Sequence, residues 1–294
     1  MLEDFAVFIL SHGRPDKVIT LNTLKRQGYT GDYYIIIDNE DKTADKYYKN
    51  FGDKVIMFDK AAIAETFDEG DNFGDRRAVV YARNACFEIA RDLGITYFLQ
   101  LDDDYGRFDY RFNSNFNYIQ KLIINLDGVL GLVLDYYKSI NAKSIALMQS
   151  GDYIGGKDSS HGTAIRAFRK CMNVFFCSTE RPFQFVGRIN EDVNTYIWYQ
   201  SLGNLFLSIN NTSITQGVTQ ARVGGMTEMY LDSGTYVKSF YTVMYSPSCT
   251  KVGIMGVTDK RLHHQISWDN AVPAIISERY RKNYTGKEAS RAMP

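Results

Sequence analysis

Residues 97–105 read YFLQLDDDY, a largely apolar run that ends in three consecutive aspartates. Such a run favours a strand buried on both faces, as in the sheets of α/β proteins. A strand directs residues two apart to the same side, so Asp102 and Asp104 can converge just beyond its end. Two carboxylates there would supply hard oxygen ligands for Mg²⁺ or Mn²⁺ and leave coordination positions for a substrate diphosphate. The alternative interpretation is an acidic turn that caps the next element.

The chain before this stretch alternates between strand and helix patterns. Apolar runs at 5–11 and 33–38 predict two further buried strands, and a third short strand is expected at 54–58. Apolar residues recur at helical spacing within 15–28 and again within 78–93. This order predicts an α/β fold in which a mostly parallel central sheet is flanked by helices.

The second half of the chain has a less regular pattern. We predict a long helix over about 118–138, a strand at 145–149 that leads into a glycine-bearing loop at 150–156, and a helix over 191–201. The sequence has no internal repeat, low-complexity block or clear linker, so we expect a single domain over 1–294.

Composition sets broad limits on function. The chain has 294 residues, 45% of them apolar, which is enough to bury a large core. Its 34 basic and 34 acidic residues balance, so a nucleic-acid partner would need a local basic patch. We find no signal peptide and no stretch long enough to span a membrane, so we expect a cytoplasmic protein without membrane contact. Four cysteines without metal-site spacing are expected to be free thiols: Cys86, Cys171, Cys177 and Cys249.

Two polar segments follow the first two predicted strands, at the sheet edge where α/β proteins bind ligands. The segment 11–15 (SHGRP) forms a glycine-containing loop before a helix, which offers backbone N–H groups to a phosphate, and Arg14 adds a positive charge. Asp38 ends the second strand, where an acid in a dinucleotide fold meets a ribose hydroxyl. The alternatives are an ordinary strand-to-helix turn and a solvated acid.

Further candidates come from charged residues elsewhere. Arg83 lies on the helix before the aspartate strand, where it would orient the carboxylates, reach a nucleobase or remain exposed. Glu191 and Asp192 open a predicted helix, whose N-terminus favours acids, and either one could act as a general base toward an acceptor hydroxyl. One imidazole of His263 and His264 could complete a metal shell, although a histidine is more often not a ligand.

The order of these features resembles that of GT-A glycosyltransferases, from about Phe5 to about Lys282. More narrowly, four stretches look like the TET-associated glycosyltransferases: SHGRP, YFLQLDDDY, RINEDVNTY at 188–196 and HHQISWDNAVPAI at 263–275. That family occurs largely in bacteriophages, and it has relatives that glucosylate hydroxymethylated pyrimidines in DNA.

The resemblance implies a GT-A-like, Rossmann-type fold. Residues 1–105 would form the nucleotide-sugar-binding half, and 106–294 an elaborated acceptor-binding half with a C-terminal metal-ligand segment. It also implies roles for individual residues: metal ligation by Asp102, Asp104 and either His263 or His264; donor binding by Ser11, His12, Arg14, Asp38, Arg83, Asp103, Gly155 and Gly156; and general-base catalysis by Asp192 or Glu191.

The implied reaction is an inverting transfer of a hexose from a UDP-sugar to a hydroxymethylated pyrimidine base in DNA, as in phage DNA modification. Glucose is the first candidate for the hexose. Alternative interpretations are a protein or glycan acceptor, a metal-dependent nucleotidyltransferase, and a non-catalytic nucleotide-sugar-binding module. For a DNA acceptor, aromatic side chains could stack on the base and basic ones could contact phosphates: Tyr153, Phe183, Phe185 and Trp198 in the first role; Arg166, Arg169, Lys170, Arg181 and Arg188 in the second.

Overall fold

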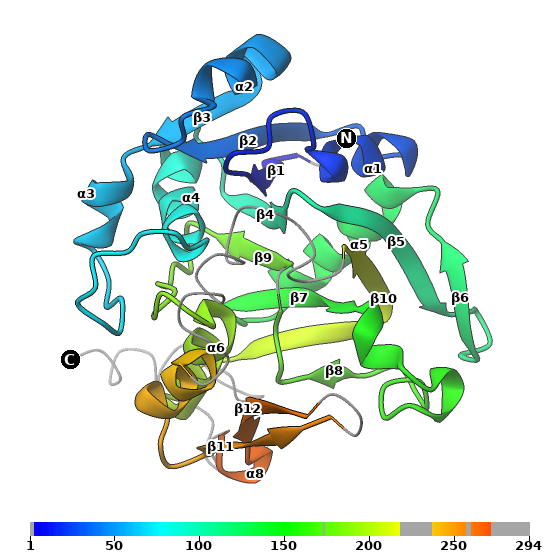
Figure 1. The fold of residues 1–294 in the computed structure, drawn as a ribbon. Coiled ribbons are helices and arrows are strands. Elements are labelled where there is room, and N and C mark those ends of the chain that lie inside the picture. Colours follow the sequence, from blue (N-terminus) through cyan, green and yellow to red (C-terminus); the bar gives the residue numbers. More distant parts are fainter. Residues whose placement is uncertain (1–2, 173, 218–236, 257–259, 272–294) are drawn as a thin grey trace, which may run out of the picture.

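The computed structural model describes residues 3–172, 174–217, 237–256 and 260–271. Its central feature is a ten-stranded sheet of order β3-β2-β1-β4-β9-β7-β10-β5-β6, with β8 paired to β10 (Figure 1). The strands are β1 (Phe5–Leu10), β2 (Asp32–Asp38), β3 (Val55–Phe58), β4 (Tyr97–Asp102), β5 (Tyr105–Phe112), β6 (Tyr118–Leu122), β7 (Ser144–Gln149), β8 (Ala167–Phe168), β9 (Phe175–Ser178) and β10 (Phe206–Gln216).

The sheet is parallel in its first part and mixed beyond it. β1 pairs in parallel with both β2 and β4, and β2 pairs in parallel with β3. β9 is antiparallel to its neighbours β4 and β7, β10 is parallel to β7, and β5 and β6 add antiparallel strands at the edge. The predicted α/β fold is confirmed, and the four strands predicted before residue 105 are all present.

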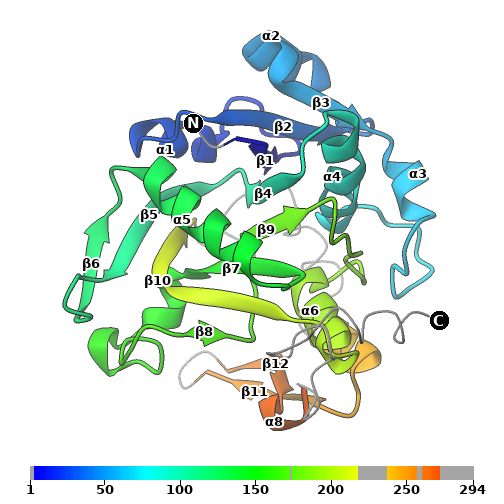
Figure 2. The ribbon, with the colours of Figure 1, turned by 180° about the vertical axis from the view of Figure 1, so that it is seen from behind.

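Helices cover both faces of the sheet (Figures 1 and 2). Successive side chains of a strand point to opposite faces, and β1 accordingly feeds two separate cores. One core includes residues of α1 (Ile19–Arg26), α2 (Ala44–Phe51) and α5 (Leu126–Ser139). The other includes residues of α3 (Lys60–Ala64), α4 (Val80–Asp92) and α6 (Glu191–Ser201). Short 3₁₀ turns lie at Gly52–Lys54, Ser150–Tyr153 and Gly156–Asp158.

The helices agree with the sequence patterns except in one region. α4 and α6 lie within the predicted ranges, but the predicted helix over 118–138 is wrong in its first part, which forms β6. Tyr118 and Leu122 pair with β5, and the side chain of Asn125 then accepts a hydrogen bond from Gly128 N, which caps α5. Cross-strand pairing and the cap therefore override the apolar periodicity before residue 126.

Gly28 ends the first helical segment in a conformation that requires glycine. Its φ is +84°, and a Cβ there would lie 2.7 Å from the backbone oxygen of Ile124. A left-handed residue packed against backbone admits no side chain, so Gly28 is needed where α1 turns back toward β2.

A two-stranded antiparallel sheet stands apart from the central one. It consists of β11 (Thr250–Met255) and β12 (Arg261–Ile266), followed by α8 (Trp268–Ala271). The ring of Trp268 stacks on Tyr196 of α6, with centroids 6.0 Å apart. Residues 237–245 form a further helical segment. Part of the resembling stretch at 263–275, from Val272 onward, lies outside the described residues. No helix in the described ranges is long and apolar enough to cross a membrane.

Candidate active site

The residues predicted from the first half of the sequence gather at one edge of the sheet. Ser11 follows β1, Asp38 ends β2 and Asp102 ends β4. β1 lies between the other two strands and runs parallel to both, with Leu10 paired to Ile36 on one side and to Asp102 on the other. The carboxyl ends of the three strands therefore meet, which is where open α/β sheets bind ligands.

A buried hydrogen-bond relay fixes the loop after β1. The backbone N–H of Arg14 donates to the hydroxyl of Tyr47, 2.9 Å away, and that hydroxyl lies 2.6 Å from Ser11 Oγ. Ser11 Oγ donates in turn to Asp103 Oδ2 at 2.6 Å. The guanidinium of Arg14 lies 3.2 Å from Asp103 Oδ1. The loop and the aspartate segment are thus one hydrogen-bonded unit.

Asp38 is held by the side chains of His12 and Lys60. Its carboxylate lies 2.7 Å from His12 Nδ1 and 3.3 Å from Lys60 Nζ, and Lys60 is itself buried. The hydrogen bond to Asp38 raises the pKa of His12. Burial opposes the charge on Asp38, but His12 and Lys60 outweigh it and lower the pKa of that carboxyl. Asp38 is therefore an ionised hydrogen-bond acceptor at neutral pH.

The three aspartates form a turn between β4 and β5 that Thr20 of α1 holds in place. Thr20 Oγ1 donates to the backbone oxygen of Asp102 at 2.6 Å, and it accepts the N–H of Tyr105 at 2.9 Å. Asp103 is buried, and its pKa rises to about 6, mainly because of burial; the charges of Asp102 and Asp104 contribute to the rise, while Arg14 and the hydrogen bond from Ser11 oppose it. Negative charge is thus concentrated at this strand end.

Arg83 joins this strand end to the start of α6. Its Nη2 lies 3.1 Å from Asp102 Oδ1, and its Nε donates to Glu191 Oε1 at 3.0 Å. The guanidinium is 1% exposed and lies over the rings of Phe175 and Phe185, at 5.2 and 5.8 Å from their centroids. A buried arginine therefore connects a carboxylate of the aspartate turn to one of the acidic pair.

The structure distinguishes the two acids of that pair. Glu191 is buried and bound to Arg83, and burial raises its pKa to about 7. Asp192 is partly exposed, and among the described residues no cation lies within ion-pair distance of its carboxylate. Burial also raises the pKa of Asp192, while Arg83, Lys238 and Lys170 act in the opposite direction. Asp192 is thus the better placed to accept a proton.

Asn190 fixes the first turn of α6 and brings later segments to it. It has a left-handed backbone (φ 56°), which asparagine tolerates better than most residues. Its amide Nδ2 donates to the backbone oxygen of Lys238 at 2.6 Å and to Thr242 Oγ1 at 3.2 Å, and it lies 3.4 Å from His264 Nδ1. The acidic pair, the helical segment 237–245 and β12 thus meet around one side chain.

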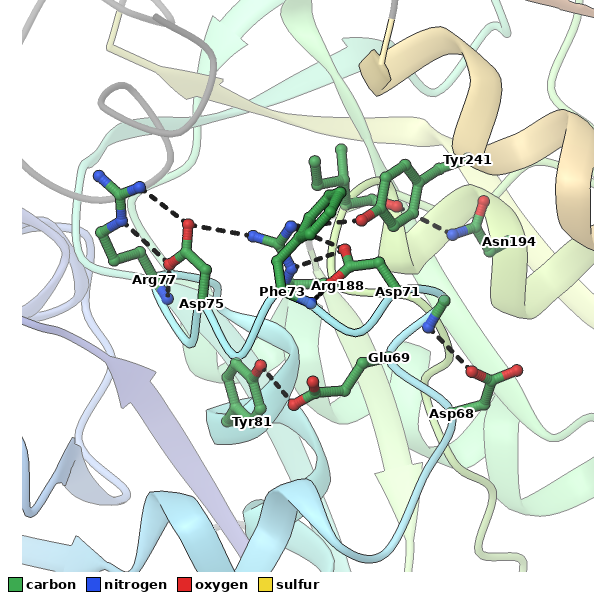
Figure 3. Close-up of polar contacts among 12 residues, drawn as sticks. Asp68, Glu69, Asp71, Phe73, Asp75, Arg77, Tyr81, Arg188, Asn194 and Tyr241 are labelled. Carbon is green, nitrogen blue, oxygen red and sulfur yellow. Dashed lines mark hydrogen bonds and ion pairs between the residues drawn. The ribbon is translucent and has the colours of Figure 1, made fainter. Parts of the chain in front are cut away.

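Arg188 clamps the loop between α3 and α4 to the segment that leads into α6 (Figure 3). Its Nε and Nη2 donate to Asp71 Oδ2 at 2.9 and 2.7 Å, and its Nη1 lies 3.3 Å from Asp75 Oδ2. Nη2 also lies 3.3 Å from the hydroxyl of Tyr241. The backbone N–H groups of Gly187 and Arg188 donate to the backbone oxygens of Asp68 and Glu69. Side-chain and backbone bonds thus hold this loop in one position.

Gly187 makes the clamped segment intolerant of a side chain. Its φ is +82°, and a Cβ there would lie 2.4 Å from Asn194 Nδ2 and 2.8 Å from the ring of Tyr245. The segment from Gly187 to Asn190 is therefore held in a conformation that its neighbours impose, as is common beside active sites.

Comparison with known proteins adds the family. A protein-family model described as TET-Associated Glycosyltransferase matches residues 5–225. The chain belongs to this family. The protein is therefore a glycosyltransferase, as the resemblance of its motifs predicted. No curated protein matches the sequence.

Solved structures of two other proteins resemble this chain at low sequence identity. Glucosyl-3-phosphoglycerate synthase from Mycobacterium tuberculosis, in complex with Mg²⁺ and uridine diphosphate, is 12% identical, with 89% of this chain and 87% of that chain covered and a TM-score of 0.45. Its complex with Mn²⁺, uridine diphosphate and phosphoglyceric acid is 11% identical, with 92% and 88% covered and a TM-score of 0.45. S. aureus TarS is 12% identical, with 73% and 37% covered and a TM-score of 0.41.

Other predicted residues of this glycosyltransferase lie on elements further along the chain than the aspartate turn. His263 and His264 are on β12, and in the described part of the chain no three His, Cys, Asp or Glu side chains are grouped to hold a metal. Burial and neighbouring cations lower the pKa of His264 to about 3, so it is neutral. Gly155 and Gly156 have φ of +95° and +61°, which by itself accounts for glycine there. The metal and sugar roles of these residues stay predictions.

Several residues considered for DNA contact are engaged inside the protein. Phe183 and Phe185 are buried in the core beside α4, so they cannot stack on a base. Arg188 is the clamp described above, and Arg181 donates to the backbone oxygens of Tyr137 and Ile140. The ring of Tyr153 is also buried. Those expectations failed because sequence alone does not show whether an aromatic or basic residue faces the core.

Sequence reasoning missed residues that reach the site from other elements. Tyr47 of α2, Lys60 of α3 and Thr20 of α1 contact the strand-end residues, and Asp71 pairs with Arg188. Lys60 and Asp71 are 22 and 117 positions from their partners, so no local motif links them. The cysteines, by contrast, are free as expected.

Replacing Arg188 with methionine should lower the kcat of sugar transfer by about 10²-fold, because a misplacement of about 1 Å near reacting groups has an effect of that size. The nucleotide Kd should stay unchanged, since Arg188 binds Asp71, Asp75 and Tyr241, which lie outside the strand ends. Steady-state kinetics and calorimetric nucleotide titration measure both quantities, with Arg91→Met on the exposed side of α4 as the matched control. A proportional loss of nucleotide binding would show that the clamp merely supports the whole fold.

Proposed function

We propose that this glycosyltransferase moves a hexose from a UDP-sugar to the hydroxymethyl group of a modified pyrimidine in DNA, with Mg²⁺ or Mn²⁺ as cofactor. Glucose is the first candidate for the hexose. The observation that carries the proposal is the Asp102–Arg83–Glu191 network, in which one buried arginine touches both carboxylates. A transfer enzyme must hold its donor and its acceptor close together. This network joins the aspartate turn, on the proposed donor side, to the acidic pair, on the proposed acceptor side.

The donor would lie across the carboxyl ends of β1, β2 and β4. Asp38 is ionised and suits a ribose hydroxyl, and Arg14 of the loop after β1 supplies a guanidinium near the phosphates. The guanidinium of Arg14 lies 3.2 Å from the carboxylate of Asp103, so the loop and the aspartate turn present both positive and negative groups to a nucleotide. This arrangement supports binding of a nucleoside diphosphate.

The aspartate turn fits a divalent cation in its chemistry. Asp102 and Asp104 offer the carboxylate oxygens that Mg²⁺ and Mn²⁺ prefer, and their charges add to the effect of burial in raising the pKa of Asp103 between them. Asp102 and Asp104 would hold the ion, with His263 or His264 as the proposed third ligand. When bound, the cation offsets the negative charge of the nucleoside diphosphate leaving group. Arg83 fixes the orientation of Asp102 and keeps the neighbouring charge balanced.

The acceptor hydroxyl would lose its proton to Asp192. Burial raises the pKa of Asp192, and a carboxylate of raised pKa is a stronger base than an ordinary aspartate. Glu191 would act through Arg83 as a positioning residue. A base that activates the acceptor directly leads to a single displacement with inversion at the sugar carbon, through an oxocarbenium-like transition state.

The test is sugar transfer from a panel of UDP-sugars, with Mn²⁺, to matched DNA that contains either cytosine or hydroxymethylcytosine. We expect a mass gain of one hexose on the modified DNA only, and its loss in Asp102→Asn/Asp104→Asn. UDP-sugar hydrolysis without transfer to DNA would overturn the acceptor and direct the search to a protein or glycan. Nucleotide transfer in place of sugar transfer would identify a nucleotidyltransferase.

A further inference from the structure

A groove lies between α5 and the strands β5, β8 and β10, on the face of the sheet that α5 covers (Figure 2). Its volume is about 490 Å³, within the range of roughly 300–1,000 Å³ that is usual for small-molecule sites. Arg83 and Glu191 belong to α4 and α6, which pack on the other face. The groove is therefore separate from the network that joins the proposed donor and acceptor sites.

A bulge in β10 supplies two polar residues to this groove. β10 advances from Ile209 to Ser213 while its partner β7 advances by a single residue, so residues 210–212 are extra on β10. Neighbouring residues of a regular strand point to opposite faces, but Asn211 and Thr212 both line the groove. Bulges re-aim side chains in this way, and they are frequent beside functional sites.

Asn210, the first residue of the bulge, anchors it through its side chain and its backbone. Its Oδ1 accepts the N–H of Arg166 at 2.7 Å, and its Nδ2 donates to the backbone oxygens of His161 and Ala164 at 2.7 and 2.8 Å. Its backbone oxygen accepts the hydroxyl of Tyr153 at 2.6 Å. These bonds hold the bulge in one conformation, so the two residues that follow are presented to the groove in a fixed way.

The polar atoms of those two residues lack the partners that Asn210 has. Asn211 Oδ1 and Thr212 Oγ1 are buried, and neither forms a hydrogen bond with any residue that the structure describes. Thr212 as a whole is 1% exposed. Buried polar atoms are nearly always hydrogen-bonded, so two adjacent exceptions that line one groove indicate a ligand that supplies the missing partners.

These two atoms restrict the chemistry of the ligand. An amide oxygen only accepts hydrogen bonds, and a threonine hydroxyl both accepts and donates, so the ligand must carry hydroxyl or N–H groups. A phosphodiester would bring acceptors alone, and a hydrocarbon would leave both atoms unpaired. Arg166 is the only charged residue among the described residues that line the groove, and its guanidinium already donates to Ser160 O and Thr163 Oγ1. The groove therefore favours an uncharged ligand with hydroxyl groups.

The walls of the groove require that the same ligand also has an apolar surface. They are formed largely by aliphatic and aromatic side chains, among them Tyr110, Val129, Leu132, Val133 and Tyr136. A saccharide ring has hydroxyls around its edge and C–H groups on its faces, so it can bond to the bulge while a face packs against these side chains.

We propose that this groove binds a saccharide, with ring hydroxyls bonded to Asn211 and Thr212 and a C–H face packed against Tyr110 and α5. The site is additional to the donor and acceptor sites, and it does not depend on the DNA acceptor proposed above. A free sugar and a sugar unit within a glycan chain present the same chemistry to it, and the experiment distinguishes these two sources.

Saturation-transfer NMR gives the Kd of methyl glucoside and of maltotriose, with UDP and Mn²⁺ at saturation so that the donor site is blocked. We expect both saccharides to bind the wild type; a lower Kd for maltotriose would identify a glycan segment as the source, and equal values a single sugar. Thr212→Val replaces the hydroxyl with a methyl group of similar size and should weaken binding about 10-fold, the effect of one lost hydrogen bond. Thr212→Ser keeps the hydroxyl and should retain binding. Thr215→Val, on the same strand but not among the residues that line the groove, is the matched control.

Urea unfolding separates a binding role of Thr212 from a structural one. The free energy of unfolding of Thr212→Val should equal or exceed that of the wild type, because the hydroxyl that it removes is buried without a partner. Absence of saccharide binding in the wild type, or undiminished binding in Thr212→Val, would overturn the proposal. Adenosine that binds with the same dependence on Thr212, where the saccharides do not, would overturn the saccharide as the ligand class.

Discussion

Asp192→Asn should lower the kcat of sugar transfer by about 10²- to 10⁴-fold, the range that a general base contributes. Nucleotide binding should not change, because Asp192 contacts none of the strand-end residues. The asparagine has nearly the same shape and keeps an oxygen for the N–H of Val193, which now donates to Asp192 Oδ1 at 2.8 Å. The loss would therefore report the missing proton acceptor and not a distorted helix. Transfer kinetics measure it, with the exposed Asp135→Asn of α5 as control.

The dependence of the transfer rate on pH tests the assignment of Asp192 as the base independently. Only the ionised carboxylate accepts a proton, so the rate should fall as pH drops through the pKa of the base. Burial raises the pKa of Asp192, so the acidic limb should lie above the ordinary range of an aspartate. In Asp192→Asn this limb should disappear. If it persists there and disappears in Glu191→Gln, then Glu191 is the base and the roles assigned to the pair are reversed.

Arg83→Met should remove transfer and also destabilise the fold. The substitution leaves the buried carboxylate of Glu191 and the partly exposed carboxylate of Asp102 without their shared cation, and breaking a buried pair such as Arg83–Glu191 costs about 3–5 kcal/mol. Methionine fills much of the same space between Phe175 and Phe185, so lost packing contributes little. Urea unfolding measures the free energy of unfolding, and calorimetric titration with UDP in the presence of Mn²⁺ measures the Kd of the donor site.

A second variant keeps this prediction testable if the first folds poorly. Arg83→Met/Glu191→Gln removes one of the two stranded charges, so it should recover part of the stability while transfer stays low. The double-mutant cycle then isolates the coupling between Arg83 and Glu191. Near-additive effects of the two substitutions would contradict the network, because residues in direct contact should not behave independently.

The strand ends illustrate what local patterns can predict. Buried parallel strands are continuous apolar runs, and parallel strands bring their carboxyl ends to one edge, so the grouping of Ser11, Asp38 and Asp102 follows from sequence order alone. The helix from Glu191 to Ser201 was likewise predictable. The region from Tyr118 to Leu122 was not, because its strand depends on pairing with β5 and its apolar residues also fit a helix.

Local patterns in the sequence were enough to predict the α/β order of elements and the family, and they located the carboxylates that we propose carry the chemistry, because each of these is written in short stretches of residues. Which of two adjacent acids is paired with a cation appears only in the folded chain, since Arg83 reaches Glu191 across 108 positions of sequence. The role of Arg188 also depends on distant contacts. Its sequence context suggested a contact with DNA, but in the fold it is buried and binds Asp71 and Asp75. Burial and ion pairing are properties of contacts between distant segments, and a residue's own neighbours in sequence do not specify them.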